Sequence, residues 1–137
     1  MSIFFHATEK RLSQRYLRKR REWILNCIRS ENFTVSTIHF IFCSDSYLLE
    51  INQNFLKHDF FTDVITFPEC HGSIIGGEIY ISIDRVKENA KLLKIGFETE
   101  LNRIMIHGTL HLMNYDDSNM VGKSLMTDKE NLMLEMF

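Results

Sequence analysis

The sequence contains, at residues 107–117, the stretch HGTLHLMNYDD. His107 and His111 lie four residues apart, and on an α-helix residues at i and i+4 share one face, so both rings can reach one ion. Asn114 and the residues after it are typical of a helix stop and a turn, which brings Asp117 back towards the histidine pair. Zn²⁺ accepts histidine nitrogen and carboxylate oxygen, and three protein ligands leave one position open for chemistry. The stretch therefore predicts a hydrolase with one Zn²⁺ per chain.

The helix that carries the two histidines is predicted from the residues before them. Apolar residues at 101, 104, 105 and 112 have helical spacing and predict a helix that runs from Glu98 to a stop at Asn114. The histidines fall beside this apolar stripe, on the same side as Glu100. Glu100 is either a carboxylate that orients a ligand ring or an ordinary surface charge. Asp116 is either a hydrogen-bond acceptor near the metal or part of a solvated turn.

Gly108 excludes one class of hydrolase. Zinc proteases with the H-E-x-x-H motif place a glutamate, the general base, directly after the first histidine. That position here is Gly108, which has no side chain to accept or donate a proton. A glycine inside a helix costs about 1 kcal/mol relative to alanine, which indicates a structural reason such as a close backbone approach.

The composition is that of one globular domain. The chain has 137 residues, of which 45% are hydrophobic and 25% charged, and this is enough for a single core. No apolar run reaches the roughly 18 residues that a membrane span needs, and the first residues lack the apolar segment of a signal peptide. The three cysteines, an odd number without C-x-x-C spacing, are typical of reduced thiols. We therefore expect one domain over residues 1–137, located in the cytoplasm and not attached to a membrane.

Basic residues are concentrated near the N-terminus. Seven of the sixteen lysines and arginines fall within residues 10–21, on a helix predicted at about residues 9–30. Such a basic face can hold a phosphate backbone, and it also occurs as an ordinary solvated helix surface. The net charge of −2 indicates no overall preference for nucleic acid. The candidates for RNA contact on this helix are Arg11, Arg15 and Arg18.

Local patterns predict the remaining elements. Strands are expected at 36–43, 64–67 and 78–83, where β-branched and aromatic residues are frequent. Helices are expected at 47–55, 84–93 and 125–137, the first capped by Ser44–Ser46 and the second by Asp84, with a loop or turn at 72–77. These elements predict an α+β fold: a single small domain with a mixed sheet of about three or four strands, about five helices and the metal centre at the end of a central helix.

The stretch at 107–117 also resembles a family signature. The pattern H-G-x-L-H-L-x-x-Y-D of residues 107–116 is similar to the H-G-x-L-H-L-x-G-Y-D-H of the YbeY-type endoribonucleases. Further matches keep their order and spacing across about residues 50–132. They are Ile51-Asn52, Asp59 with Thr62-Asp63-Val-Ile-Thr-Phe-Pro68, Gly77-Glu78-Ile79, Glu100-Leu101 and Met126-x-x-x-Glu130.

The resemblance implies an α+β fold and a metal-dependent endoribonuclease that acts in ribosomal RNA maturation and ribosome quality control. The implied partners are ribosomal RNA and the small ribosomal subunit. Single-stranded RNA is the expected substrate, because unstacked strands reach a cleft that a duplex does not enter. The metal would either activate water for attack on phosphorus or polarise a phosphoryl oxygen while the ribose 2′-hydroxyl attacks.

The site residues under this interpretation are His107, His111 and Asp117 as zinc ligands, with Glu100 as a further catalytic candidate. Two alternatives stay open. The first is a catalytically weak ribosome-assembly or RNA-binding factor whose metal is structural. The second is another metal-dependent hydrolase, which acts on a different phosphoester or on an amide.

Two positions depart from the family pattern in ways that affect the chemistry. The third ligand of the family is usually histidine, and here it is Asp117, whose negative charge makes a zinc-bound water less acidic. The family commonly has an arginine where this chain has Leu56, and an arginine binds RNA phosphate with a planar fork. Lys57 and His58 are the candidates to replace it, although neither provides such a fork. We therefore expect the metal site to be retained, and catalytic strength is the property that Leu56 puts in question.

Overall fold

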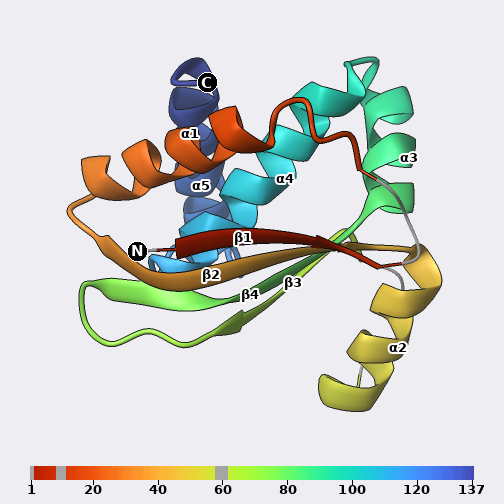
Figure 1. The fold of residues 1–137 in the computed structure, drawn as a ribbon, viewed down its shortest axis with the longest axis horizontal. Coiled ribbons are helices and arrows are strands. Elements are labelled where there is room, and N and C mark those ends of the chain that lie inside the picture. Colours follow the sequence, from red (N-terminus) through yellow and green to blue (C-terminus); the bar gives the residue numbers. More distant parts are fainter. Residues whose placement is uncertain (1, 9–11, 58–61) are drawn as a thin grey trace.

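One mixed sheet organises the chain, and the computed structural model describes residues 2–8, 12–57 and 62–137 (Figure 1). The strand order is β1-β2-β4-β3, in which β1, β2 and β4 run parallel and β3 pairs antiparallel with β4. The predicted α+β fold with a mixed sheet is confirmed. The strands are β1 (Ser2–Ala7), β2 (Thr34–Cys43), β3 (Val64–Pro68) and β4 (Ile74–Ser82).

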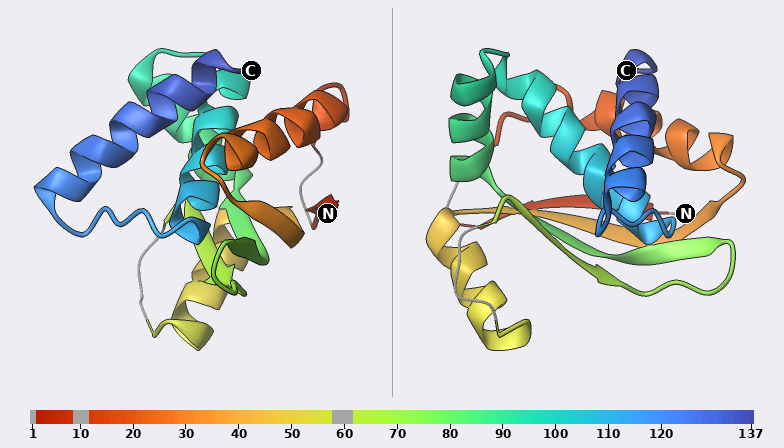
Figure 2. Two further views of the ribbon diagram at one scale, coloured as in Figure 1. Left: turned by 90° about the vertical axis from the view of Figure 1, so that its left-hand side faces the viewer. Right: turned by 180° about the vertical axis from the view of Figure 1, so that it is seen from behind.

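Helices cover both faces of this sheet unequally, as Figure 2 shows. α1, α3, α4 and α5 lie on one side, and α2 lies on the other. The main core fills the space between the four-helix layer and the sheet, and a smaller apolar cluster lies under α2. None of the helices in the described ranges is long and apolar enough to cross a membrane. Their bounds are α1 (Leu17–Ser30), α2 (Asp45–Phe55), α3 (Ile83–Leu93), α4 (Phe97–Leu112) and α5 (Met120–Glu135).

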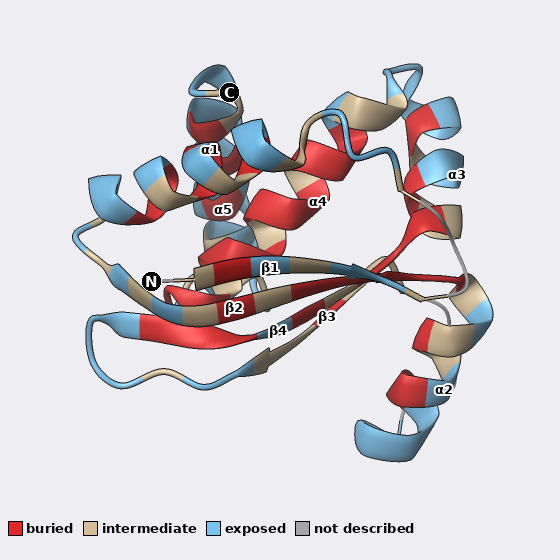
Figure 3. Cartoon of the chain, in the orientation of Figure 1, coloured by how far each residue is buried: buried red, intermediate tan, exposed pale blue. Residues whose placement is uncertain are grey.

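α4 is the central helix, and it packs on β3 and β4. The apolar stripe that predicted it is buried, and Figure 3 shows that buried residues extend over most of its length. Gly96 occupies its N-cap position, and the acidic residues Glu98 and Glu100 in its first turn interact favourably with the helix dipole. The expected stop at Asn114 is confirmed, because this residue has a φ of 70°, the left-handed conformation that ends many helices. The chain therefore reverses direction just after the two histidines.

Gly108 packs closely against β4. A Cβ atom at this position would be 2.8 Å from Cγ2 of Ile79, a fully buried β-branched side chain on β4. Overpacking of a core costs about 1–3 kcal/mol. The gain in helix propensity from glycine to alanine offsets about 1 kcal/mol of that cost.

We expect Gly108→Ala to lower the free energy of unfolding by about 1 kcal/mol, measured by urea denaturation. Gly96→Ala adds the same methyl group without a close contact, because the nearest atom to its added Cβ is 3.9 Å away, and its cost is limited to the preference of the N-cap for glycine over alanine. A Gly108→Ala protein as stable as the wild type would show that α4 can move away from β4 without cost.

Several predicted helix boundaries are wrong by a few residues. α1 begins at Leu17 and not near residue 9, and residues 9–11 lie outside the described part of the chain. α3 is capped by the Ser82 hydroxyl, which accepts from the Arg85 N–H, and not by Asp84. α5 begins at Met120 and not at residue 125, because the Asn119 side chain caps it.

Two strand assignments also needed the tertiary structure. No strand was predicted for residues 2–7, and β4 begins at Ile74, inside the segment 72–77 that was expected to form a turn. Both segments acquire their strand character from β2: Ser2 pairs with Thr37, and Ile74 pairs with Thr34. A local sequence pattern does not predict pairing between residues so far apart in the chain.

Candidate metal centre

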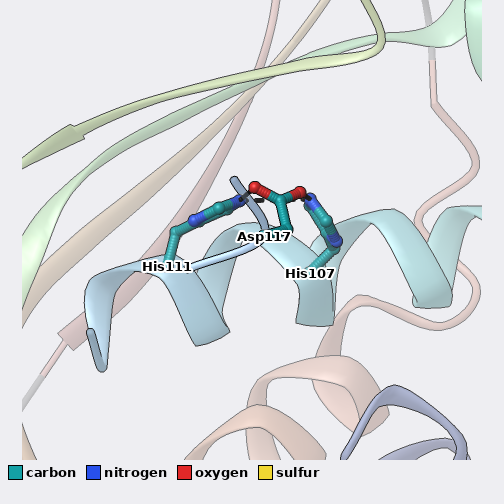
Figure 4. Close-up of side chains that lie close together, drawn as sticks. All are labelled: His107, His111 and Asp117. Carbon is teal, nitrogen blue, oxygen red and sulfur yellow. Dashed lines mark hydrogen bonds and ion pairs between the residues drawn. The ribbon is translucent and has the colours of Figure 1, made fainter. Parts of the chain in front are cut away.

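Three predicted ligand residues gather at the C-terminal end of α4 (Figure 4). The Nε2 atoms of His107 and His111 are 3.2 Å apart. The Asp117 carboxylate lies beside them, with Oδ2 3.5 Å from His107 Nε2 and Oδ1 3.8 Å from His111 Nε2. Across the described ranges this is the one group of three histidine, cysteine or carboxylate side chains whose ligand atoms all lie within 4.8 Å of one another. The turn after α4 therefore brings the carboxylate to the histidine pair.

The outer nitrogens of the two rings show which atoms face the group. His107 Nδ1 lies 2.6 Å from a carboxylate oxygen of Glu130, and His111 Nδ1 lies 3.1 Å from the backbone carbonyl of Tyr115. An ionised carboxylate and a carbonyl only accept hydrogen bonds, so each Nδ1 must donate. In a neutral ring, Nε2 then carries a lone pair. Two lone pairs at 3.2 Å repel unless a proton or a cation lies between them, so this donor set fits a divalent cation.

The electrostatics of the two rings differ. Burial opposes a charge on His107, but the hydrogen bond with Glu130 and the charges of Glu130 and Asp117 outweigh it, and the pKa of His107 is raised. Burial and the positive charge of His107 lower the pKa of His111. These shifts favour a positive charge on His107 over one on His111. A metal ion that binds to both Nε2 atoms competes with protons for them.

The group opens onto a cleft of about 530 Å³ between α4 and β3. Polar side chains and one exposed apolar side chain, Leu56, form the wall opposite the histidines. Thr62 and Asp63 belong to this wall. The full lining is Asn52, Leu56, Thr62, Asp63, Val64, Ile65, Thr66, His107, His111 and Asp117.

Glu100 takes neither of the two roles left open for it: among the described contacts it does not orient a ligand ring, and it is not a surface charge. The structure pairs this fully buried carboxylate with Arg103 and with Asn89, and Glu130 on α5 is the residue that contacts the His107 ring. The local spacing on one helix face suggested Glu100, whereas Glu130 lies 23 residues after His107. The only signal for Glu130 in the sequence was its place in the Met126-x-x-x-Glu130 match.

The basic residues proposed for RNA contact lie away from the cleft or at its edge. Arg15 and Arg18 are exposed near the start of α1, and neither lines the cleft. Arg20 is buried, where it donates to Asn102 and Glu98 and joins α1 to α4. Lys57 is exposed and directly follows the cleft residue Leu56. Arg11 and His58 lie outside the described residues.

A hydrogen bond across the fold holds the turn that carries Asp117. The Tyr115 hydroxyl donates to Glu31 at the end of α1, and the Lys129 ammonium on α5 lies 2.9 Å from the same carboxylate. Burial raises the pKa of Glu31, but the hydrogen bonds from Tyr115 and Lys129 outweigh it, so the pKa of Glu31 is lowered overall. Burial and the bond to Glu31 raise the pKa of Tyr115 to about 12. Glu31 therefore connects the end of α1 with the turn after α4 and with α5.

We expect Glu31→Gln to lower the free energy of unfolding by about 2 kcal/mol near neutral pH, because hydrogen bonds to a charged group are worth that much. A carboxyl group whose pKa is lowered on folding stabilises the protein above its unfolded pKa, near 4.5, and loses this contribution as the pH falls through the folded value. The difference between wild type and variant should therefore shrink in acid, as measured by urea denaturation across pH. Glu88→Gln, an exposed site on α3, is the control. A difference that grows in acid would contradict the assignment.

Comparisons with known proteins show similarity over most of the chain. A sequence model described as Endoribonuclease YbeY matches residues 2–137. The Endoribonuclease YbeY of Flavobacterium psychrophilum is 50% identical over 115 residues, which cover 84% of this chain and 82% of the relative. That of Cytophaga hutchinsonii is 40% identical over 137 residues, with 98% and 95% covered.

A solved structure shares the fold. The solution structure of a Thermotoga maritima protein is similar, with a TM-score of 0.72 and 31% sequence identity, over 98% of this chain and 87% of that one. The family model spans nearly the whole chain, and each of the two relatives covers more than four fifths of it. This chain therefore belongs to the Endoribonuclease YbeY family.

Proposed function

We propose that this protein is a zinc-dependent endoribonuclease, with residues 1–137 as one hydrolase domain, that cleaves single-stranded RNA in the cytoplasm. We further propose that its substrate is ribosomal RNA and that its partner is the small ribosomal subunit. The observation that carries the proposal is the group of His107, His111 and Asp117 at the wall of an open cleft. Relatives that cover most of the chain and bear the name Endoribonuclease YbeY support the reaction class.

His107 Nε2, His111 Nε2 and an Asp117 oxygen would hold the ion. A zinc ion there would supply a Lewis acid for a phosphoryl oxygen and would acidify a water molecule. Asp117 carries a negative charge where the family pattern has a neutral ring, so the net positive charge of the site is lower by one. We infer that this charge raises the pH optimum of cleavage, because a water molecule at a less positive site gives up its proton less readily.

The shape of the cleft favours a single strand. Its volume of about 530 Å³ lies within the range of small-ligand pockets, so it accommodates one splayed nucleotide and not a stacked duplex. Thr62, Asp63 and Asn52 place polar groups along the wall opposite the histidines. These groups would orient the nucleotide whose phosphate faces the metal group.

One observation favours a second candidate function, an RNA-binding assembly factor with weak catalysis. Among the described residues that line the cleft, none is a lysine or an arginine, and Leu56 occupies the position of the family arginine. A phosphate at this position would receive no pair of hydrogen bonds from a planar guanidinium group. Binding without efficient cleavage is the expected behaviour of such a site.

The deciding experiment measures zinc content after purification without chelator, together with cleavage of a labelled single-stranded RNA. We expect about one zinc per chain and cleavage that a chelator abolishes, with both lost in Asp117→Ala. Asp116→Ala is the matched control, because this neighbouring exposed carboxylate bonds to Ser118 and not to the histidines. Zinc without cleavage would favour the assembly factor, and protein without zinc would refute the metal site.

A further inference from the structure

Five polar side chains form a continuous chain of hydrogen bonds that begins at the His107 ring and ends at Asp63 in the wall of the cleft. We call them the polar chain: Glu130 on α5, Arg103 and Glu100 on α4, Asn89 on α3, and Asp63 before β3. The two glutamates are buried, and the other three residues are partly exposed. The first link joins His107 Nδ1 to Glu130 over 2.6 Å, and the second joins Arg103 Nη1 to the other Glu130 oxygen over 3.4 Å. The chain thus begins at a proposed metal ligand.

Arg103 is held by a second carboxylate in a forked geometry. Its Nε and Nη2 atoms donate to the two oxygens of Glu100 over 2.8 and 2.5 Å. The Asn89 amide then donates over 3.3 Å to Glu100 and over 3.3 Å to Asp63. The bonds to Glu100 therefore fix the Arg103 guanidinium in the position from which it contacts Glu130.

The burial of the two glutamates makes this arrangement costly. Glu100 is 0% exposed and Glu130 is 5% exposed. A buried carboxylate costs several kcal/mol unless charges and hydrogen bonds compensate it. The hydrogen bond to Glu100, together with the charges of Glu100 and Glu130, raises the pKa of Arg103 despite its burial, so the compensating charge is permanent.

Glu130 occupies a position where packing alone calls for an apolar residue. The buried residues of α5 are Met126, Glu130 and Met133, at helical spacing i, i+4 and i+7. An apolar side chain at 130 would continue this stripe without the cost of a buried charge. The carboxylate is therefore explained by its contact with His107 and not by the core.

We propose that Glu130 is the residue that positions His107 for metal binding, and that Arg103 in turn positions Glu130. This inference rests on the metal site proposed above. Because the Glu130 carboxylate only accepts hydrogen bonds, it keeps the His107 proton on Nδ1 and directs Nε2 towards His111 and Asp117. Glu100 holds Arg103 directly, and Asn89 holds Glu100.

The first test is the zinc affinity of variants, measured by competition with a chromophoric chelator. We expect Glu130→Ala to bind zinc about 10- to 100-fold more weakly than the wild type. Glu130→Gln, which retains an acceptor for the Nδ1 proton, should recover most of that loss, and Arg103→Lys, which loses the fork, should be weaker than wild type. Glu135→Gln, an exposed site on the same helix, should be unchanged. Wild-type zinc affinity in Glu130→Ala would overturn the proposal.

The second test reads the ring directly in metal-free protein and so does not depend on zinc. Long-range ¹⁵N–¹H NMR of the histidine rings, in alkaline buffer where they are neutral, reports which nitrogen carries the proton. We expect the His107 proton on Nδ1 in wild type and in Glu130→Gln, and a mixture of tautomers in Glu130→Ala. If Glu130→Ala does not fold, an Nε2 proton on His107 in the wild type or in Glu130→Gln overturns the proposal by itself. Failure of the metal site would appear instead as wild-type protein that binds no zinc.

Discussion

Replacing both His107 and His111 with alanine is expected to remove bound zinc and to abolish RNA cleavage. The double variant retains Asp117 alone of the three proposed ligands, and one partly buried carboxylate does not hold a metal ion against water. The loss of affinity should exceed the roughly 100-fold that the loss of an outer hydrogen-bond partner costs. Metal analysis of the purified protein and cleavage of a labelled single strand provide the two measurements.

The fold should survive this double substitution. Both rings are only partly buried, and neither belongs to the apolar cores, so the domain should still fold. Loss of the His107 ring removes a hydrogen bond from the buried Glu130, so the unfolding temperature should fall by more than the loss of stabilisation by bound metal alone. His71→Ala is the matched control, since this exposed histidine lies outside the site. Undiminished zinc in the double variant would refute the ligand assignment, whatever happened to cleavage.

Leu56→Arg is expected to raise kcat/KM for RNA cleavage by about tenfold or more. Leu56 lines the cleft at the end of α2 and is 40% exposed, so a longer polar side chain fits without burying its charge. A hydrogen bond to a charged phosphate contributes about 1.5–3 kcal/mol. Each 1.36 kcal/mol of transition-state stabilisation corresponds to about a factor of ten in rate.

Phe55→Arg separates the specific contact from the added charge. Phe55 is the preceding residue and is 70% exposed, but it lines a different depression, with Ile51 and Tyr80. It should change the rate only slightly, and both variants should show a steeper dependence on salt. Equal rates for Leu56→Arg and Phe55→Arg would show that the cleft does not bind phosphate at this position.

The sequence was informative wherever a signal is local. Ser44 was expected to cap the helix after β2, and it accepts a hydrogen bond from the Tyr47 N–H. A break was expected between the helices predicted at 84–93 and from Glu98 onward, and Gly96 lies in this break as the N-cap of α4. Capping, chain reversal and helical periodicity involve residues within about four positions of one another, so a short sequence pattern is enough to predict them.

Arg20 shows where this kind of reasoning fails. In the sequence it belongs to a basic run that indicates a solvated or RNA-binding surface. In the structure it is buried, because its partners Glu98 and Asn102 lie 78 and 82 residues later and approach it only when α1 packs on α4. The same limit applies to β1, an edge strand whose only partner is β2.

The candidate site divides in the same way. The sequence by itself determined the histidine pair and the turn that returns Asp117 to it, because a helix face and a left-handed stop are local features. Only the tertiary structure decided that Glu130, and not Glu100, contacts His107, and that Leu56 lies in the wall of the cleft. These contacts join α5 to α4 and α2 to β3, and they depend on how the elements pack on the sheet, which periodicity within a single helix does not encode.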